Sequence, residues 1–544
     1  MIQRKLLLTT ALIYANGELH LGHLVENVRA DTWKRFQHMR GHDCLLIGGS
    51  DCHGTPIMLN AEKQGITPEE LINKSRASQF QDLQDFGISF DNFYLTHSEE
   101  NKQLSEQIFL KLAAADLIET KTIKQAYDPV KEMFLPDRFI KGTCPKCKAA
   151  DQYGDGCEVC GATYSPIDLI NPKSVVSNAT PIEKESEHLF FNLPRLEQPL
   201  REWLQQNHIP TQLSNKLQEW FDTGLKSWDI SRDAPYFGFE IPNHPNKYFY
   251  VWLDAPIGYL ASLENYCKTH PEKTLKQYWD KNSDAEIYHF IGKDIIYFHA
   301  LFWPALLMGA NYRLPTQIQV NGFLTINGEK LSKSRGNFIN AKDYLRVLSP
   351  CYLRYYLAAK LNNHIEDIDL NFEDFKNRVN ADLIGKYINL ASRSAGFITK
   401  YFNGHLATAI DTPELLEKFA DAENSIADDF EQLALSQAMR KIMELADMAN
   451  HYVAEKAPWK MIKEENQQEA TQQVCTTILN LFRILSIYLK PVIPHTIKKV
   501  EEFLNIPELS WQDLRTILLG HTINPFTPLL QRIEDDQVAS LLKK

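Results

Sequence analysis

The chain has 544 residues, of which 44% are hydrophobic and 23% are charged, and its formal net charge at pH 7 is -11. A single hydrophobic core rarely grows beyond about 250 to 300 residues, so this length predicts several domains. The composition excludes a largely disordered chain, and the acidic balance excludes indiscriminate binding of nucleic acid, which needs a broadly positive surface. Any RNA must therefore bind to local patches.

The amino-terminal residues combine Arg4 and Lys5 with an apolar run, a pattern that signal peptides share. We favour a buried strand, because the run contains Thr9 and Thr10 and leads directly into a histidine motif. No stretch reaches the ~18 uninterrupted apolar residues of a membrane span. Nine cysteines, four of them clustered, are typical of reduced thiols. The sequence therefore predicts a cytoplasmic protein without membrane contact.

The first part of the chain alternates strands and helices, as a doubly wound parallel sheet does. A strand is predicted over residues 5–15, followed by a turn at Asn16-Gly17 and a helix with apolar residues at helical spacing. A second strand is predicted over 44–48, and helices over 68–76 and 99–115. These elements form the first piece of an α/β domain.

The pattern changes in the middle of the chain and then returns. Residues 116–228 consist of short polar segments with many Pro and Gly, which indicates an insertion. Strands at 248–253 and 286–291, a helix at 294–308 and a strand at 317–326 then complete the sheet. Residues 327–337 have the composition of a loop, and from about residue 374 helical periodicity predicts a bundle.

The motif His20-Leu21-Gly22-His23 lies where the first strand leads into the first helix. The amino end of a helix offers unpaired N–H groups and a positive dipole end, and two imidazoles one turn apart add donors, so the motif suits phosphate. Gly22 lets a flat ring approach the backbone. The alternative is a pair of surface histidines that cap a helix.

A second motif, Lys330-Leu331-Ser332-Lys333-Ser334, carries two lysines about one turn apart in the predicted loop. Such a loop can close over phosphates while negative charge builds up at phosphorus. Alone, the motif is better explained as a solvated basic loop. Together with the histidine motif, it predicts a nucleotide site.

Four cysteines, Cys144, Cys147, Cys157 and Cys160, form two Cys-x2-Cys pairs separated by nine residues. Two such pairs can deliver four thiolates to one tetrahedral Zn²⁺ at ~2.3 Å. Because no ligand position is left open, we expect one structural ion per chain. Two disulfides are the alternative, which we disfavour because the Cys-x2-Cys spacing strains a direct bond.

The histidine and lysine motifs together resemble those of class I aminoacyl-tRNA synthetases. Residues 11–17 (ALIYANG) and 249–256 (FYVWLDAP) resemble the methionyl-tRNA synthetase family in particular, and the resemblance extends over essentially the whole chain. It implies an ATP-dependent ligase that converts methionine to methionyl-adenylate and transfers it to the 3' end of methionine tRNA, initiator and elongator. Mg²⁺ would accompany the ATP.

The resemblance also implies roles for individual residues. His20, His23, Lys330 and Lys333 would act on the phosphates, and ATP or adenylate would contact Gly22, Arg232, Gly292, Asp294 and Lys333. The methionine pocket would contain Leu12, Tyr14, Asp51, Trp252, Ala255, Pro256, Tyr259 and His299. Aromatic faces suit a thioether, and Asp51 would pair with the substrate ammonium. Core packing explains each pocket residue singly, and a salt bridge with Asp229 or Asp233 explains Arg232.

In the helical part, Asp382, Lys386, Asn389 and Arg393 step along one predicted helix face as a polar stripe. Such a stripe is usually only the solvated face of a helix. The resemblance implies that Asn389 and Arg393 read anticodon bases and that an unstacked base lies on Trp459. Burial of the indole in the core is the alternative for Trp459.

The expected fold is α/β: a Rossmann-like, doubly wound parallel sheet interrupted by a zinc-knuckle insertion and followed by an all-α helix bundle. We place the two halves of the catalytic domain at 1–115 and 229–325 and the insertion at 116–228. The lysine loop and stem-contact region would span 326–385, and the anticodon-binding domain 386–544. Because no residues remain for a further tRNA-binding domain, we expect a monomer.

Three alternatives to this interpretation remain open. A synthetase for leucine, isoleucine or valine usually carries a larger editing insertion, and one for cysteine is a further candidate. A small-molecule nucleotidyltransferase shares the histidine motif but usually lacks both a zinc knuckle and a helical tail. A noncatalytic tRNA-binding protein would not need to retain His20, His23 and Lys333.

Overall fold

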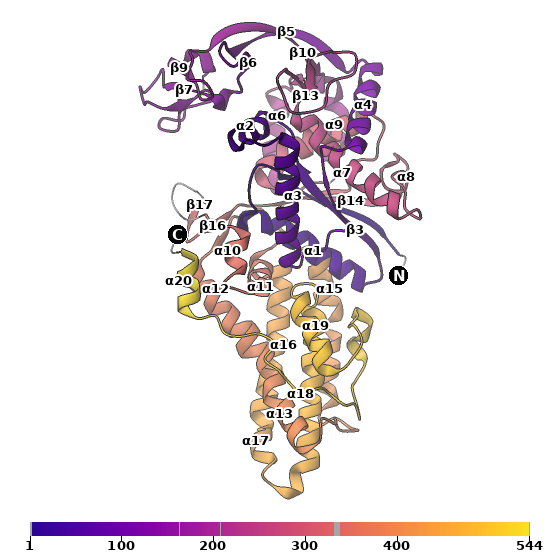
Figure 1. Cartoon of the computed structure of the whole chain (residues 1–544). Coiled ribbons are helices and arrows are strands. Elements are labelled where there is room, and N and C mark those ends of the chain that lie inside the picture. The colour runs from indigo at the N-terminus through magenta and orange to yellow at the C-terminus, as the bar shows by residue number, and fades with distance from the viewer. Residues whose placement is uncertain (1–2, 163, 207, 331–337, 543–544) are drawn as a thin grey trace.

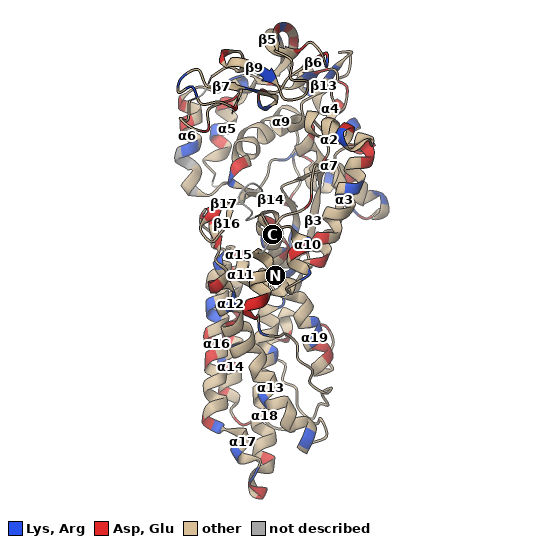
Figure 2. Ribbon diagram, turned by 60° about the vertical axis from the view of Figure 1, so that its left-hand side comes forward, with Lys and Arg blue, Asp and Glu red and all other residues tan. Residues whose placement is uncertain are grey.

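The computed structural model describes residues 3–162, 164–206, 208–330 and 338–542. An α/β part and an elongated helix bundle lie end to end, and an insertion arches over the side of the α/β part remote from the bundle (Figure 1). Along the ribbon, Lys and Arg are interspersed with Asp and Glu in both parts (Figure 2).

The centre of the α/β part is a parallel sheet. Its strands run in the order β15-β14-β1-β3, with β4 beside β3 and the short β2 pairing with the end of β3. Their bounds are β1 (Lys5–Thr10), β2 (Ile13–Tyr14), β3 (Asp43–Asp51), β4 (Asn92–Leu95), β14 (Glu286–Gly292) and β15 (Gln317–Asn321). The chain extends outward from β1 in both directions, which leaves a crevice at the carboxyl ends of β1 and β14.

Helices cover both faces of this sheet because successive strand residues point to opposite sides. Leu6 and Leu8 of β1 pack with residues of α1 (Leu24–Met39), whereas Leu7 packs with residues of α7 (Val251–Thr269). The other helices of this part are α2 (Thr55–Gln64), α3 (Pro68–Asp85), α4 (Glu99–Ala114), α8 (Lys276–Trp279) and α9 (Trp303–Gly309). The uninterrupted apolar run of β1 is thus explained by burial on both faces.

The insertion is built on a long antiparallel pair, β5 (Ile118–Asp128) and β10 (Ile182–Phe191). A small sheet at its far end has the order β8-β7-β9. The remaining elements are β6 (Met133–Phe134), β7 (Ile140–Thr143), β8 (Gln152–Tyr153), β9 (Ile170–Ser174), α5 (Glu197–Leu204), α6 (Ser214–Asp222) and β11 (Trp228–Asp229). The last strand of the insertion, β11, pairs with the end of β10, so the chain leaves the insertion next to β10.

The helix bundle surrounds α18 (Gln468–Leu489), which is buried over most of its length. Its other helices are α10 (Ala341–Leu345), α11 (Pro350–Lys360), α12 (Phe372–Val379), α13 (Asn389–Tyr401), α14 (Pro413–Asp421), α15 (Glu423–Glu431), α16 (Leu435–Lys456), α17 (Pro458–Met461), α19 (Pro494–Leu504) and α20 (Asp535–Leu542). Among the described residues, no helix is long and apolar enough to cross a membrane.

The predicted fold class is confirmed, but four predicted elements differ locally. Residues 5–15 form two strands. Residues 248–253 do not join the parallel sheet, because β13 (Lys247–Phe249) pairs with β12 (Ser231–Asp233) and α7 begins at Val251. Residues 317–326 divide into β15 and β16 (Leu324–Ile326), which pairs with β17 (Glu329–Lys330) and β18 (Ile368–Leu370). They divide at Gly322, where an added Cβ would lie 2.1 Å from the backbone oxygen of Glu366.

The fourth difference concerns the predicted helix 294–308. It consists of a 3-10 turn (Lys293–Ile295), a π-helical segment (Phe298–Phe302) and α9. Pro304 has no N–H to donate to the preceding turn, which is consistent with a wider turn at this point. Residues Asn380–Ile388 are also π-helical, so the predicted α-helical stripe that begins at Asp382 does not keep its spacing.

A buried ion pair joins the two parts of the molecule. Arg354 of α11 donates from Nη2 to Asp31 of α1 at 2.7 Å, and both side chains are almost fully buried. Its other N–H groups donate to backbone oxygens after α3 and α18, including those of Phe86 and Val492. Burial raises the pKa of Asp31, but Arg35 and Arg354 outweigh this effect and hold it below its usual range.

We predict that Asp31→Asn lowers the free energy of unfolding at pH 7 by ~3 to 5 kcal/mol, because it leaves the guanidinium of Arg354 buried without a counter-charge. Urea denaturation measures this change. Because the pKa of Asp31 is lowered by folding, the stabilisation is present above its unfolded value of about 3.9 and is lost as the pH falls through the folded value.

The matched control is Asp421→Asn, which removes the partner of Arg515 in an exposed pair. This change should cost at most about 1 kcal/mol. Equal effects of the two substitutions would contradict a special role for the buried pair.

Candidate active site

A cavity of about 1130 Å³ lies at the carboxyl edge of the parallel sheet. Segments that follow four different strands contribute to its wall, because parallel strands all end at the same edge. The wall residues at the ends of these strands or just beyond them are Ala11, Leu12, Ile13 and Tyr14 for β1, Asp51, His53, Gly54, Thr55 and Pro56 for β3, Gly292, Asp294 and Ile295 for β14, and Asn321, Gly322, Phe323 and Leu324 for β15. The predicted nucleotide site and part of the predicted amino-acid site therefore line the same cavity.

His20 and His23 lie at this cavity in a 3-10 turn (Leu21–His23) that leads into α1. The backbone N–H of Gly22 donates to Nδ1 of His20 at 3.1 Å, and that of His20 donates to Nδ1 of His23 at 3.3 Å. Burial and the neighbouring His20 lower the pKa of His23 to about 3, so this ring is neutral at pH 7. Because Nδ1 of His23 accepts a hydrogen bond, the proton of this neutral ring lies on Nε2, from which it can be donated.

The lysine motif can be followed only at its flanks. Lys330 ends β17, its side chain lies outside the described residues, and Lys333 lies in the undescribed segment 331–337. The chain that follows this segment packs against the histidine motif: the ring of Phe338 meets that of His20 edge-on at 4.9 Å, and the N–H of Leu21 donates to the carbonyl of Ile339. Phe338 also lines the cavity. The flank that follows the lysine segment therefore belongs to the same cavity region as His20.

Polar groups at the end of β14 and on α1 form one side of the cavity. An added Cβ at Gly292 would lie 2.6 Å from Oδ1 of Asp294, so a larger residue here would displace this carboxylate from its position. Asp294 follows a strand of the sheet, where a carboxylate can bind ribose hydroxyls. Glu26, one turn after His23, also lines the cavity, and burial raises the pKa of Glu26 to about 8. The charge of Asp294 raises it further, whereas a hydrogen bond with Asn321 lowers it.

A smaller cavity of about 40 Å³ adjoins the large one. Seven of the eight residues predicted to bind methionine line it: Leu12, Asp51, Trp252, Ala255, Pro256, Tyr259 and His299. The eighth, Tyr14, lines the large cavity. The ring of Trp252 stacks on Phe298 at 3.8 Å, and the hydroxyl of Tyr259 lies 2.9 Å from Nε2 of His299. The walls are thus mainly aromatic, with few hydrogen-bonding groups, as a thioether requires.

Asp51 ends β3 where the two cavities meet. Its Oδ1 is buried and has no hydrogen-bond partner among the residues that the structure describes. Burial raises the pKa of Asp51 well above its usual value, and the charge of Asp254 raises it further. A buried carboxylate with an open acceptor is a suitable partner for a cationic substrate group, whose charge would favour the ionised form.

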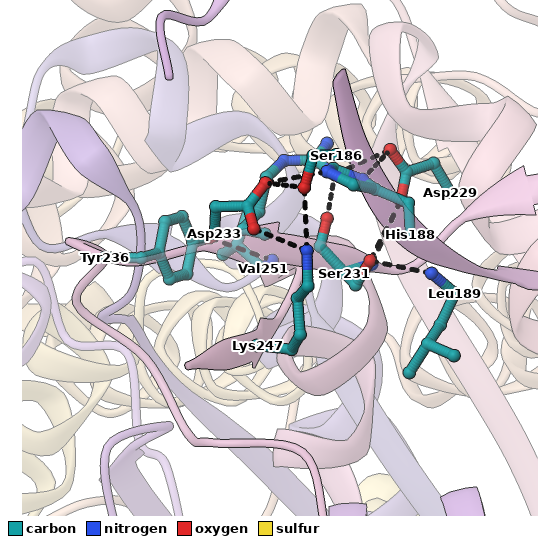
Figure 3. Close-up of polar contacts among 10 residues, drawn as sticks. Ser186, His188, Leu189, Asp229, Ser231, Asp233, Tyr236, Lys247 and Val251 are labelled. Atoms are coloured by element: carbon teal, nitrogen blue, oxygen red, sulfur yellow. Dashed lines mark hydrogen bonds and ion pairs between the residues drawn. The ribbon is translucent and has the colours of Figure 1, made fainter. Parts of the chain in front are cut away.

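Arg232 also lines the cavity, and a polar network holds the strand that carries it (Figure 3). Its guanidinium lies over the ring of Tyr250 at 3.8 Å and pairs with Asp229 at 3.3 Å. The predicted salt bridge with Asp229 is therefore present, and it does not remove Arg232 from the cavity. His188 of β10 bridges Asp229 and Asp233, with Nδ1 and Nε2 at 2.8 and 3.0 Å from the two carboxylates.

The insertion closes the opposite wall of the cavity. Residues Gln125, Phe134, Leu135, Pro136, Asp137 and Phe139 line it. Sequence reasoning missed these residues because nothing local indicates that the insertion folds back over the sheet. It also missed Glu26, although the helical spacing from His23 was an available signal, and Phe338, which follows the lysine motif.

The four cysteines gather at the far end of the insertion. Their sulfur atoms all lie within 4.8 Å of one another. The separations Cys144–Cys160 and Cys147–Cys157 are 3.8 and 3.5 Å, close to the ~3.8 Å that tetrahedral zinc bonds of ~2.3 Å imply and far from a disulfide bond of ~2.05 Å. The disulfide alternative is therefore contradicted, and the cluster can hold one metal ion.

The residues predicted to read the anticodon lie on two helices toward the end of the bundle that is farther from the sheet (Figure 1). Arg393 of α13 is exposed, and Asn389 is half-buried and donates to the carbonyl of Gly385. Trp459 of α17 is 39% exposed, which argues against a purely structural indole. Lys386, from the same predicted stripe, pairs with Asp447 within the bundle.

Comparisons with known proteins match both parts of the chain. A family model described as class I tRNA synthetases (M) matches residues 6–395, and one described as the anticodon-binding domain of methionyl tRNA ligase matches 407–544. A solved structure of Mycobacterium tuberculosis methionyl-tRNA synthetase in complex with methionyl-adenylate has a TM-score of 0.81 at 26% identity, covering 97% of this chain and 99% of that chain.

Two further structures of methionyl-tRNA synthetase from the same organism are similar. One, bound by methionyl-adenylate, has a TM-score of 0.80 at 25% identity and covers 97% of this chain and 100% of that chain. The other, an apo form, has a TM-score of 0.75 at 24% identity with coverages of 98% and 99%, which supports the fold alone.

We predict that His188→Gln destabilises the protein more below pH 6 than above pH 8. Burial lowers the pKa of His188, but hydrogen bonds to Asp229 and Asp233 outweigh this effect and raise it. A raised histidine pKa stabilises the fold fully below the unfolded value of about 6.5, and this stabilisation is lost as the pH rises through the folded value. The loss should be ~1.5 to 3 kcal/mol at low pH, the strength of hydrogen bonds to a charged group.

Thermal denaturation at a series of pH values measures this effect. The matched control is His451→Gln at an exposed position of α16, which should leave the pH dependence as in the wild type. A His188→Gln penalty of the same size at all pH values would mean that the bridging histidine is not charged.

Proposed function

The chain belongs to the class I aminoacyl-tRNA synthetases of the methionyl type, and from this membership we propose how its residues carry out the reaction. As a methionine-tRNA ligase, the protein activates methionine with ATP and charges tRNA. One observation carries this conclusion: two family models, one catalytic and one specific to methionyl anticodon-binding domains, together match almost the whole chain. A small-molecule nucleotidyltransferase and a synthetase for another amino acid do not fit the second match.

Activation requires no protein nucleophile. The methionine carboxylate attacks the α-phosphorus of ATP and pyrophosphate leaves, and a ribose hydroxyl of the terminal adenosine of tRNA then attacks the methionyl carbonyl and AMP leaves. The side chain of methionine would occupy the smaller cavity between Trp252 and Tyr259, with its ammonium on Asp51. This placement directs the carboxylate toward the large cavity, so catalysis would rest on positioning and on stabilisation of charge.

The phosphates would bind along the histidine motif. Both imidazoles line the cavity, Nε2–H of neutral His23 can donate to a phosphate oxygen, and the amino end of α1 adds its dipole. Lys330 and Lys333 would neutralise the charge that develops on the departing pyrophosphate, and ATP would enter as its Mg²⁺ complex. Asp294 would bind the ribose, Gly22 and Gly292 would let the adenosine approach the backbone, and Arg232 would lie beside the adenylate.

Zinc is the metal that suits the cysteine cluster, because four thiolates at tetrahedral spacing are its usual structural ligands. We propose one structural ion per chain, held by Cys144, Cys147, Cys157 and Cys160. It would stabilise the end of an insertion that has only a small apolar core. No open ligand position remains for catalysis.

We further propose the division of the chain into catalytic halves at 1–115 and 229–325, an insertion at 116–228, a stem-contact region at 326–385 and an anticodon-binding region at 386–544. Asn389, Arg393 and Trp459 would contact the anticodon, which initiator and elongator methionine tRNAs share. A cytoplasmic monomer is the form that we expect to act.

ATP-pyrophosphate exchange tests the activity, and a substitution at Trp459 tests the division of labour. We predict exchange with methionine alone among the amino acids. Trp459→Ala should leave this exchange unchanged and lower kcat/KM for tRNA charging roughly 5- to 150-fold, the loss of ~1 to 3 kcal/mol of base stacking. Trp459→Phe retains an aromatic face and should recover most of the charging. Loss of exchange and charging together in Trp459→Ala would indicate a structural tryptophan instead.

Elemental analysis tests the metal. We predict about one zinc per chain, which Cys147→Ser should reduce and Cys267→Ser, outside the cluster, should not. Removal of zinc by a chelator should increase hydrogen exchange in residues 140–175 before it affects the rest of the chain. A protein that contains no zinc but shows normal protection in this segment would refute a structural metal.

A further inference from the structure

Three residues behind Asp51 form a hydrogen-bonded chain. Nδ1 of His53 lies 2.6 Å from Oδ2 of Asp254, and Nε2 of the same ring lies 2.9 Å from Nδ1 of His97. His53 follows β3, Asp254 belongs to the first turns of α7, and His97 lies in the loop between β4 and α4. Asn101 donates to the backbone oxygens of both Thr96 and Asp254, which ties this loop to α7.

The chain of residues leads from the protein surface to a buried carboxylate. His53 and Asp254 are fully buried, whereas His97 is only half-buried. Phe237 and Phe239 stack on the ring of His97 and meet that of His53 edge-on, so apolar rings surround the two imidazoles. Polar groups in such surroundings interact strongly because water does not screen them.

Asp254 and Asp51 are two buried carboxylates whose charges oppose each other. In the part of the chain that the structure describes, Oδ1 of each has no hydrogen-bond partner. The charge of Asp254 disfavours ionisation of Asp51, as burial does. Compensation of Asp254 by a proton on His53 would remove part of this penalty.

We propose that His97, His53 and Asp254 form a proton relay that sets the ionisation of Asp51 and thereby the pH range in which the site binds an amino acid by its ammonium group. The inference rests on the proposed role of Asp51. In one state, neutral His97 donates from Nδ1 to Nε2 of neutral His53, which donates from Nδ1 to Asp254. In the other, Nε2 of His97 has taken a proton from solvent and its Nδ1 proton has moved to His53.

The second state holds one more proton than the first, and it places the positive charge on His53 beside Asp254. His97 is neutral in both, in agreement with its pKa, which burial and His53 lower to about 4. Because the positive charge of His53 then balances that of Asp254, Asp51 ionises at lower pH. Its carboxylate supplies the negative charge that pairs with the substrate ammonium. The relay residues thus position charge and do not themselves contact the reacting atoms.

Other titratable groups face this cluster, but they do not balance the charge of Asp254. Burial raises the pKa of the Tyr14 and Tyr236 hydroxyls and raises that of the Cys52 thiol to about 12, so all three are uncharged at neutral pH. The charge of Glu69 on α3 opposes the lowering of the pKa of His97. The charge of Arg232 on β12 opposes the raising of the pKa of Tyr236. His53 is thus the group in direct hydrogen bonding with Asp254 that can compensate its charge.

The test is the dissociation constant of methionine measured by calorimetry from pH 5 to pH 9 with the full chain. Binding should weaken as the pH falls through the raised pKa of Asp51. We call this loss of affinity at low pH the acidic limb. Asp254→Asn should shift the acidic limb to lower pH, because the negative charge that opposes ionisation of Asp51 is gone. His97→Phe keeps the stacking but removes the partner of His53, and it should shift the limb to higher pH. A shift of about one unit in either direction corresponds to ~10-fold in affinity on the limb.

Three controls separate the possible outcomes. Asp428→Asn, an exposed change on α15, should reproduce the wild-type limb. The deaminated analogue 4-(methylthio)butanoate, which has no ammonium, should bind without this limb. Asp51→Asn should weaken methionine binding and abolish the limb; unchanged binding would refute the proposed role of Asp51 itself.

If Asp51→Asn behaves as expected but Asp254→Asn and His97→Phe leave the position of the limb unchanged, the relay is refuted while the proposed function stands. A uniform loss of affinity at all pH values in both variants would likewise indicate a structural role and overturn the proposal.

Discussion

The carboxyl edge of the parallel sheet is the constraint on which the site depends. Strands that run in parallel all end at the same edge, so the segments after β1, β3, β14 and β15 meet there although up to about 300 residues separate them in the chain. The order of the strands leaves a crevice beside β1, and the amino end of α1 brings His20 and His23 to it. The two adjoining cavities are consequences of this topology.

Burial gives the groups at this edge their chemical character. His23 is neutral because the cavity wall removes it from water, Glu26 holds its proton at neutral pH, and burial raises the pKa of Asp51. Burial thus favours the uncharged form of each of these groups in the empty cavity. The buried ion pair of Asp31 and Arg354 joins α1 to the helix bundle.

The sequence predicted those parts of the site whose residues lie close together in the chain, and little of the contacts between distant segments. The short spacing within each Cys-x2-Cys pair brings its two thiols together, and the three-residue spacing brings His20 beside His23. In contrast, the aromatic run at 248–253 has the composition of a strand, yet α7 begins within it because the segment packs on the sheet as a helix. The hydrogen bond between His53 and Asp254 spans 201 residues, and no local pattern indicates it.

We infer that the two adjoining cavities at the sheet edge hold the two halves of methionyl-adenylate. The most direct test is a crystal structure of the protein with a non-hydrolysable analogue of this adenylate. We expect the thioether between Trp252 and Tyr259, the ammonium on Asp51, and the phosphate analogue beside the imidazoles of His20 and His23. An analogue bound elsewhere, without contact to these side chains, would contradict this placement of the substrates.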